Sequence, residues 1–577
     1  MAHLFLCSIG PVQEFIVNAR RSRDLWYGSW MLSTIAKAVA REVLTLGGTL
    51  IFPNPVDPSN LNLNSDFSSP NRVSAVFEEF DKKKANEIKE AAFKSLMDLW
   101  DEAMVHIENQ VKVHNANPTF TFTDPELPKK QIEELLEFYW VAVPFEEDNY
   151  PQARDQAEAL LAARKNTRDF KIDDGDFVPK SSLDGIRESV IPEPHYNRAD
   201  AAQFLYKVYR ARGAERLSGV DLLKRLGRLS DEHNFPSTSD VAAAPLMSTL
   251  TKSKQKQLIQ DLKMLLIEAG IPDEEIAENA SLVFESRFRE YLGELPSKDE
   301  DLKKYRKIVN DAFDGELPNP YYCLFIADGD NMGKRISDLV DINSHSKLSQ
   351  DLSTFAATLP DEIKKQAGTC IYAGGEDILA YLPLHTALEY ASQLNVDFKR
   401  KIGTTLSGGL VIAHHLTPLN EVMRLAREAE KESKKTEKES KKTEEESKKI
   451  EKKNALTVVL SKRSGADTEI TDNWGALVER LLVLKGWIKG GLLGQGVGYE
   501  LEKLARDFQA FNLVKNQSHR DAIANEAIRI IDRKKQANTT IPLGNDVKNK
   551  LREWIVTDKV SVAQLADEII VASEFTN

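Results

Sequence analysis

Cysteine is scarce in this chain, with three residues in 577 and no Cys-x-x-Cys pair. Each of them (Cys7, Cys323 and Cys370) stands in an apolar run. This pattern excludes a disulfide framework and a cysteine-rich zinc site, and it indicates a reducing compartment, the cytoplasm. No run approaches the ~20 uninterrupted apolar residues of a membrane-spanning helix, so we expect no membrane contact. The first ten residues lack a basic region and predict a β-strand rather than a signal peptide.

An excess of positive charge is also missing. The chain has 77 Lys and Arg against 89 Asp and Glu, a formal net charge of −12. A protein that grips a phosphate backbone by itself usually shows a basic face. If RNA or DNA is involved, we therefore expect it to be touched locally or presented by other subunits. The length exceeds what one core can hold and predicts roughly three to five domains.

What is present is an element order that occurs twice. In the first third we predict strands at 3–8, 49–52, 72–77 and 138–143, and helices at 12–23, 31–46, 81–113 and 152–168. From residue 321 we predict strands at 321–327, 369–373, 378–382, 406–414 and 455–460, the last one closing the sheet, and helices at 349–366, 386–401 and 419–430. Both orders are typical of a ferredoxin-like sheet, so the fold class is α+β with two such domains.

These two domains define the predicted organisation. We place the first at 1–177, a small and mainly helical linking domain at 178–314, the second sheet at 315–470, and a helical C-terminal domain at 471–577. A Lys/Glu-rich run at 431–453 repeats the heptad Lys-Glu-Ser-Lys-Lys-Thr-Glu. Its Ser and Thr positions supply almost no apolar seam, which favours a solvated helical extension or a disordered insert over a partner-binding coiled coil.

Two loops of the second sheet carry the chemistry. Asp328 ends the first strand, and Glu376 and Asp377 lie in the hairpin Gly-Gly-Glu-Asp. The first strand of a βαββ unit is central, so these acids are predicted to converge. Carboxylates that close repel one another unless a cation neutralises them, which suits Mg²⁺ or Mn²⁺. Two such ions can activate a 3′-hydroxyl and steady leaving pyrophosphate, so we predict a metal-dependent site that joins ATP units.

Residues around these acids are predicted to contact the nucleotide, because glycines admit close backbone approach and a Gly-Lys turn offers amides and an ammonium. They are Gly329, Asp330, Asn331, Met332, Gly333, Lys334, Gly374 and Gly375. Ser407 and Gly408 could make room for adenine or ribose, with a simple strand kink equally favoured. The adjacent His414 and His415 point to opposite faces of a strand, so we expect structural histidines rather than a metal site.

Several segments resemble the large subunit of type III-B (Cmr) CRISPR effector complexes, in order over nearly the whole chain. They begin with residues 8–15 (Ser-Ile-Gly-Pro-Val-Gln-Glu-Phe), 19–26 and 28–33, and continue with 183–185, 215–218, 235–238, 328–333, 345–349, 372–377, 414–415 and 454–456. The resemblance implies two palm domains of the nucleotidyl cyclase (GGDEF-like) type. It implies assembly with other Cmr subunits, guide RNA and target RNA. It also implies target-RNA-activated synthesis of an oligoadenylate second messenger from ATP.

Three features depart from that family. Many relatives begin with an HD-type nuclease domain, whereas this chain contains no His-Asp dipeptide, so we expect no DNA cleavage by this subunit. Relatives often bind zinc between the palms, where this chain has Lys180-Ser-Ser-Leu, so we predict no zinc. The usual hairpin is Gly-Gly-Asp-Asp. Glu376 keeps the charge and adds one methylene, so metal binding should survive.

The first palm lacks the acids for two-metal chemistry. Its first strand ends Cys-Ser-Ile-Gly-Pro, and residues 53–70 contain no Gly-Gly-acid-acid turn. The resemblance implies that a few of its residues position a second ATP, and the alternative is that Arg20, Arg21 and Arg23 form a solvated helix face. The implied residues are Gln13, Arg20, Arg21 and Asp24.

One assignment and the product stay open at this point. In related cyclases a lysine on the last palm helix contacts the triphosphate, and Lys431, Lys434 and Lys452 are all candidates. The alternatives to oligoadenylate synthesis are AMP transfer to another acceptor, such as S-adenosylmethionine, and a non-catalytic ATP-binding scaffold. A cyclic-dinucleotide synthase is a further reading, although such enzymes usually carry one palm and dimerise.

Overall fold

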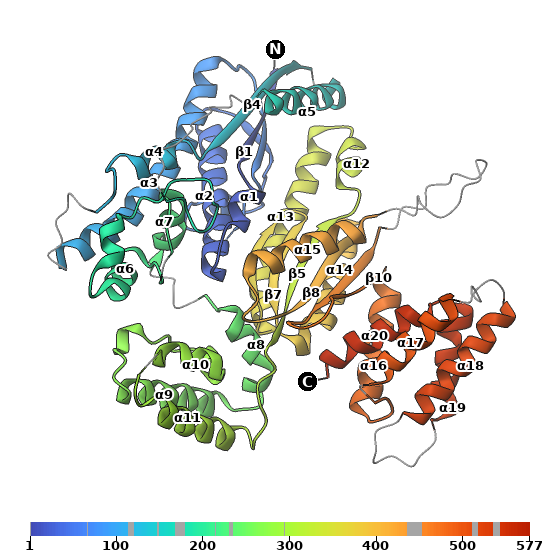
Figure 1. Cartoon of the computed structure of the whole chain (residues 1–577). Coiled ribbons are helices and arrows are strands. Elements are labelled where there is room, and N and C mark those ends of the chain that lie inside the picture. Colours follow the sequence, from blue (N-terminus) through green and yellow to red (C-terminus); the bar gives the residue numbers. More distant parts are fainter. Residues whose placement is uncertain are drawn as a thin grey trace.

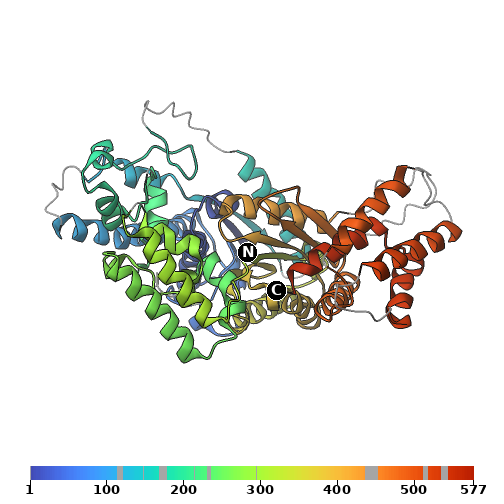
Figure 2. The same cartoon turned by 60° about the horizontal axis from the view of Figure 1, so that its bottom comes forward.

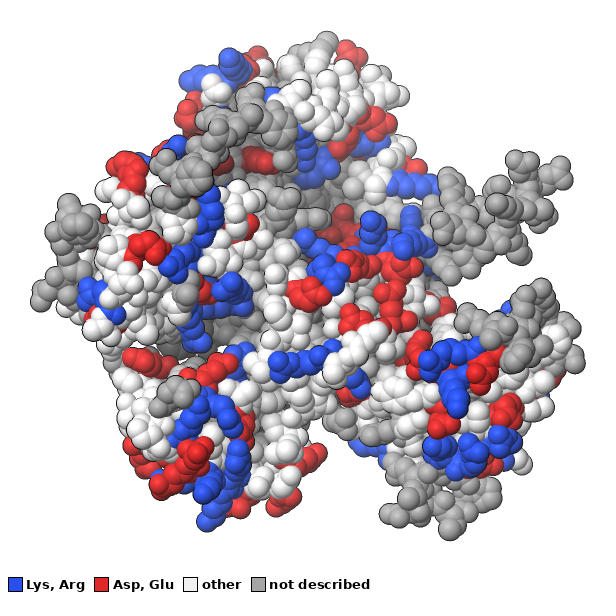
Figure 3. Space-filling model, in the orientation of Figure 1, with Lys and Arg blue, Asp and Glu red and all other residues white. Residues whose placement is uncertain are grey.

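The computed structural model (Figure 1) describes residues 2–65, 67–113, 121–146, 149–167, 179–213, 215–229, 235–293, 295–435, 453–494, 496–510, 517–534 and 543–576. Among these residues, no helix combines the length and the apolarity required to span a bilayer. The three cysteines carry free thiols, two of them buried. On the face drawn in Figure 3, acidic and basic side chains are intermixed, which agrees with the absence of a dominant basic face.

The first sheet is four-stranded and antiparallel, with the order β2-β3-β1-β4. This is the ferredoxin-like order, so that prediction is confirmed. Helices α2 and α3 share a core with one face of the sheet, and α5 covers the other face beside β1 and β4. The elements are β1 (Ala2–Gly10), α1 (Gln13–Val17), α2 (Ser22–Thr45), β2 (Thr49–Phe52), η1 (Pro58–Leu61), β3 (Arg72–Phe77), α3 (Lys82–Val113), α4 (Leu127–Glu133), β4 (Glu137–Phe145) and α5 (Tyr150–Asn166).

Helix α2 differs from the prediction because it is continuous from Ser22 to Thr45. The predicted break at 24–30 is wrong, and the chain instead interrupts the helix before Ser22. Gly28 lies inside α2. A Cβ at this position would lie close to the ring of Phe15 and the side chain of Lys224, so a glycine fits the packing here. The sequence does not reveal that the helix continues through Gly28, because a glycine that a helix needs for packing looks the same as a glycine that breaks a helix.

The linking region does not form one core of its own. Its first part packs into the core of the first palm, and its second part packs on the second sheet. The first part contains η4 (Glu193–Asn197), α6 (Ala201–Tyr209) and α7 (Gly219–Leu226). The second contains α8 (Thr238–Met247), α9 (Lys252–Glu268), η6 (Asp273–Glu275), η7 (Ala280–Val283), α10 (Glu285–Leu292) and α11 (Lys298–Ala312). The region therefore extends both palms rather than separating them.

The second sheet has six strands in the order β10-β9-β8-β5-β7-β6. Its elements are β5 (Tyr321–Gly329), α12 (Met332–Ser337), α13 (Ile342–Lys365), β6 (Thr369–Gly374), β7 (Asp377–Leu382), α14 (Leu384–Ile402), β8 (Leu406–His414), α15 (Leu419–Ser433), β9 (Ala455–Ser461) and β10 (Thr468–Asn473). The prediction that β9 is the last strand is wrong. Strand β10 escaped notice because an edge strand with the sequence Thr-Glu-Ile-Thr-Asp-Asn carries almost no apolar pattern.

The helical C-terminal region is confirmed. It comprises α16 (Trp474–Lys489), α17 (Val497–Ala510), α18 (Gln517–Arg533), α19 (Asn545–Arg552), the π-helical turn η8 (Glu553–Thr557) and α20 (Val562–Glu574). In both views these helices lie on one side of the second sheet, and α9–α11 lie on the other (Figures 1 and 2). Arg480 ties the region together, since its buried guanidinium donates to Glu568 and to Asp472 of β10 at 2.7 and 2.8 Å.

The two palms touch directly through side chains of the first. Arg154 of α5 donates to the carbonyls of Ile336, Ser337 and Leu339 at 2.7–2.9 Å, which satisfies the last turn of α12. Beside it, the Tyr150 hydroxyl and His345 Nδ1 of α13 lie 2.6 Å apart. The first palm therefore holds the helix that follows the acid-bearing strand of the second.

Candidate active site

The predicted convergence of the acids follows from the strand register. Strands β5 and β7 are antiparallel and pair Ala327 with Ile378, so the next position along the ladder places Asp328 opposite Asp377. Cross-strand neighbours have Cβ atoms about 4.5–5.5 Å apart. The hairpin closes between Gly374 and Asp377, and Gly375 at its tip has φ +69°, a conformation that favours glycine. Register and turn thus bring two of the three predicted acids side by side.

Gly329 allows the strand end and the hairpin to meet. A Cβ at this position would lie 2.8 Å from the Cβ of Glu376 and 2.7 Å from Cγ of Met332. Any side chain there would push the hairpin away from β5. The glycine predicted to admit a nucleotide therefore makes room for the hairpin that carries Glu376 and Asp377.

Repulsion among the carboxylates raises the pKa of two of them, as expected for a site in which negative charges outnumber cations. Burial and repulsion from Asp328 raise the pKa of Glu376 to about 6, with Lys434 among the groups that oppose the rise. Loss of hydration in the crowded loop and the carboxylates of Asp328 and Glu376 hold the pKa of Asp377 well above its ordinary range. Because Asp377 is exposed, repulsion by the neighbouring carboxylates, rather than loss of hydration, is the main cause of its raised pKa.

A lysine supplies the cation that the site does contain. The ammonium of Lys434, directly after α15, contacts Asp328 and lies 2.6 Å from Glu430 Oε1. Partial burial opposes its charge, but the two carboxylates raise the pKa of Lys434 above its ordinary value. Within the described ranges, no three His, Cys, Asp or Glu side chains gather closely enough to hold a metal ion by themselves.

Asp330 has a structural position instead of the predicted nucleotide contact. It is buried, and its carboxylate accepts from Thr405 Oγ1 at 2.6 Å, Ser407 Oγ at 2.7 Å and the Asn454 amide at 2.8 Å. Its backbone amide also donates to Thr405. The hydroxyl of Ser407 is likewise buried and committed to Asp330. These contacts fix the loop after β5 against β8 and β9, and they leave Asp328 as the outward acid.

The glycines after Ser407 serve the packing of the sheet. A Cβ at Gly408 would lie 2.7 Å from the Ile326 carbonyl of the neighbouring strand. A Cβ at Gly409 would lie 2.7 Å from the Cβ of Ala429 and 2.8 Å from the Ala426 carbonyl. Both glycines therefore make room for protein. Gly409 in particular lets α15, with Lys434 just beyond it, lie close to the sheet.

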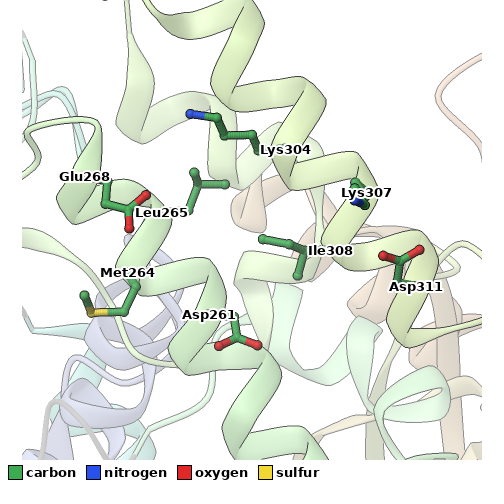
Figure 4. Close-up of a pocket in the computed structure, with 8 residues that line it drawn as sticks. All are labelled: Asp261, Met264, Leu265, Glu268, Lys304, Lys307, Ile308 and Asp311. Atoms are coloured by element: carbon green, nitrogen blue, oxygen red, sulfur yellow. The ribbon is translucent and has the colours of Figure 1, made fainter.

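The turn after Asp330 remains available for a ligand. Asn331 has φ 58° and precedes α12, Gly333 and Lys334 are exposed, and Met332 is buried beneath them. Lys453 Nζ contacts Asn331 Oδ1 across the turn. These residues lie at the same end of β5 as Asp328, as predicted. A groove of about 490 Å³ between α9 and α11 (Figure 4) contains none of the predicted residues.

The residues assigned to a second ATP in the first palm make contacts within the protein. Asp24 is buried and pairs with Arg225 of α7 at 3.0 Å, with both side chains 1% exposed. Arg21 donates to the Arg210 carbonyl at 2.7 Å, and Arg20 to the Ser182 carbonyl at 3.2 Å. Burial and the charge of Arg225 lower the pKa of Arg21 to about 10. The side chain of Gln13 lies outside the described residues.

The alternative of a solvated helix face agrees with Arg20, whose side chain is 55% exposed, but is wrong for Arg23. Arg23 is buried and donates to the carbonyls of Lys224 and Arg225, both at 3.0 Å. Helix α2 thus begins as a docking end for α7. Nothing near Arg23 in the sequence indicates this role, because its partners lie about 200 residues further along the chain.

The rings of His414 and His415 stack on each other with centroids 4.8 Å apart, so the prediction that they point to opposite faces is wrong, because β8 ends at His414. His415 is buried, stacks on Phe284 with ring centroids 4.2 Å apart, and lies 2.8 Å from Ser239 Oγ through Nδ1. Burial and the charge of Arg287 lower its pKa to about 3. The heptad repeat falls mainly at 436–452, outside the described residues, so its predicted state stays a prediction.

Comparison with known proteins covers both palms. The second palm domain of Cas10/Cmr2 matches residues 321–457, and the N-terminal domain of the CRISPR-associated protein Cmr2 matches residues 4–105. The CRISPR system Cmr subunit Cmr2 of Pyrococcus furiosus is 25% identical over 519 residues, which cover 74% of this chain and 59% of that protein. The chain therefore spans about three fifths of the length of that relative.

Two solved structures contain a chain of the same fold. They are the type III-B Cmr-beta complex in its apo state, with a TM-score of 0.65, and the same complex bound to cognate target RNA, with a TM-score of 0.67. Both matched chains are 14% identical to this one. The match to the apo complex covers 95% of this chain and 78% of the matched chain, and the match to the RNA-bound complex covers 100% and 83%. Residues 4–105 and 321–457 of this chain are therefore similar to the N-terminal domain and the second palm domain of Cas10/Cmr2 CRISPR-associated proteins.

Proposed function

We propose that this chain is the large subunit of a type III-B CRISPR effector complex and that its second palm makes an oligoadenylate from ATP. The 3′-hydroxyl of one nucleotide attacks the α-phosphate of the next, and pyrophosphate leaves. The observation that carries the proposal is the placement of Asp328 opposite Asp377 at the mouth of a Cas10/Cmr2 second palm. The structural matches support the fold alone.

The donor set suits Mg²⁺ or Mn²⁺. Two carboxylates on adjacent strands repel each other, and an ammonium already stands beside Asp328 as a substitute cation. Mg²⁺ commonly binds through one or two carboxylates plus substrate phosphates, so a complete protein cage is not required. Asp328, Glu376 and Asp377 would hold the ions. When bound, these would lower the charge on the phosphates and favour ionisation of the attacking hydroxyl.

Lys434 is the lysine that we assign to the triphosphate. Lys431 is exposed on α15, and Lys452 lies outside the described residues. Among the described lysines of this set, Lys434 contacts Asp328, and this contact supports the assignment. With divalent ions held by Asp328, the Lys434 ammonium would be available to pair with the phosphates of the nucleotide. The turn at Asn331–Lys334 would hold the same phosphates from the other side.

Partners follow from the family. The subunit would assemble with other Cmr subunits and with guide and target RNA, and target RNA would switch the site on. The acidic balance of the chain and the mixed charges of Figure 3 support RNA being held largely by other subunits. A second candidate is a non-catalytic ATP-binding scaffold, favoured by the absence of a three-ligand metal cluster among the described residues.

The assembled complex, labelled ATP, Mg²⁺ and matching target RNA provide the test. We expect pyrophosphate release that depends on target RNA and falls by at least ~10³-fold in Asp377→Ala, since one charged ligand of a two-metal site is lost. The same substitution at exposed Asp338 is the matched control. No pyrophosphate release, or release that is unchanged in Asp377→Ala, would refute the proposal that this chain is an enzyme. Mass spectrometry of the product separates oligoadenylate from AMP transfer to S-adenosylmethionine.

A further inference from the structure

Three of the four sheet edges are protected against pairing with another strand. Strand β2 has four residues and a bulge, and it lies against α13. Strand β6 is also bulged and packs against α2 and α13. Strand β10 carries Glu469 and Asp472 and lies against α20. Short length, bulges, charges and covering helices are the devices by which proteins block exposed edges.

In strand β4 a charge and a proline stand only near the ends, at Glu137 and Pro144, and α5 packs on one face of the strand. The strand runs nine residues, and its register with β1 is unbroken from Ala2 opposite Phe145 to Gly10 opposite Glu137. Within the part of the chain that the structure describes, no strand pairs with its other side. Residues 138–142, Phe-Tyr-Trp-Val-Ala, are uncharged and only half-buried. A long, regular and apolar edge of this kind is a template for strand addition.

A groove runs beside this edge. It encloses about 420 Å³ between β4 and α5, with Val141 and Ala142 on the strand and Leu160 and Ala163 on the helix. Leu160 is 45% exposed although it belongs to this apolar wall. A chain added to β4 would direct alternate side chains toward α5, and one of them would fill the groove.

We propose that β4 is a docking edge for an extended segment of a partner protein, which adds as a fifth strand and places an apolar side chain in the groove beside Leu160. Phosphate-rich RNA is not the match, because residues 138–145 contain no cation and Arg164 is the single cation among the residues that line the groove. The free edge offers main-chain N–H and C=O groups, whose natural complement is another main chain.

The charge beside the groove indicates whether its occupant is a partner protein or a second copy of this chain. The rim is basic, since α5 ends in Arg164 and Lys165, with Arg164 donating to Thr167 Oγ1 at 2.7 Å. A strand with an acidic residue beside its apolar one fits this rim. Strand β4 itself has no carboxylate between Phe138 and Phe145, so pairing of two copies would leave the rim unmatched.

Hydrogen exchange of the full chain, alone and in the assembled complex, tests the proposal. We expect the outward amides of 138–143 to exchange fast in the free chain and at least ~100-fold more slowly in the complex. Equal rates in both states would overturn it. Protection in the free chain at every concentration would mean that the chain covers its own edge. Protection that grows with the concentration of the chain alone would identify a second copy, and either result also refutes a partner.

Substitutions give an independent reading. Leu160→Lys places a charge in the groove, and we expect incorporation into the complex to fall at least ~10-fold while the Tm of the free chain stays within about 2 °C, because Leu160 is already 45% exposed. Ile186→Lys, at a loop side chain that is 74% exposed, is the control. Normal incorporation of Leu160→Lys would refute docking at β4. Both readouts are independent of ATP turnover, so a chain that docks but makes no product fails only the proposed function.

Discussion

Glu376→Gln should stabilise the protein in the absence of divalent metal at pH 8. The pKa of Glu376 is raised from an ordinary 4.5 to about 6, so the folded chain disfavours the ionised carboxylate. This difference corresponds to about 2 kcal/mol, which screening at a half-buried side chain reduces to ~1–2 kcal/mol. The penalty is absent below pH 4.5, grows as the pH rises through 6 and is complete above it. Glutamine removes it without removing the side chain.

Calorimetry at several pH values, without metal, measures the effect. For a unit the size of the second palm, ~1–2 kcal/mol corresponds to a Tm increase of roughly 2–8 °C at pH 8, and the increase should vanish near pH 4.5. Saturating Mg²⁺ should raise the Tm of the wild type more than that of the variant, because the ions bind the ionised carboxylate.

Asp328→Asn is the comparison variant. The carboxylate of Asp328 repels Glu376 and Asp377 but pairs with the ammonium of Lys434. Relief of the repulsion offsets the loss of the pair, which contributes about 1 kcal/mol or less, so we expect a smaller change in the metal-free Tm than for Glu376→Gln. The reasoning is refuted if Glu376→Gln lowers the Tm at pH 8, or if its effect is the same at pH 4.5 and pH 8.

Three further outcomes follow from packing. Arg225→Met should cost about 3–5 kcal/mol in urea unfolding, because it leaves Asp24 buried and unpaired, and Asp24→Asn in the same chain should restore part of that loss. Gly409→Val should destabilise by ~1–3 kcal/mol and lower ATP turnover, since its side chain collides with α15; wild-type turnover would contradict this. Arg154→Ala should raise the KM for ATP more than it lowers kcat, as measured by steady-state kinetics, with Arg154→Lys restoring part of the loss.

The sequence pattern was sufficient for what depends on local order. Strand periodicity and a Gly-Gly-acid-acid turn predict both ferredoxin-like sheets and the approach of Asp328 to Asp377, because a hairpin and a central strand leave few other arrangements. The sequence pattern could not assign separate roles to two acids that share one loop. Asp328 and Asp330 look equivalent in Asp-Gly-Asp-Asn, and only the hydroxyls of Thr405 and Ser407 decide which carboxylate turns inward.

Long-range charge pairing was equally hidden. Arg21 and Asp24 resemble a ligand-binding cluster in a first helix, and Arg225, the partner of Asp24, lies 201 residues away. A buried ion pair and a nucleotide site draw on the same residue types, so composition cannot separate them. The choice among the three lysines near the repeat stayed open for a different reason, since they look alike in the sequence and only the contact of Lys434 with Asp328 distinguishes it.

The contacts of Arg154 bear on how the catalytic half of the molecule can be studied. Its guanidinium serves three carbonyls at the end of α12, and no residue of 315–470 provides that arginine. A second palm excised from the chain would expose those carbonyls to water and lose the contact that supports α12, next to the turn at Asn331–Lys334. Kinetics measured on such a fragment would describe a loosened site, so a weak activity there would say little about the intact subunit.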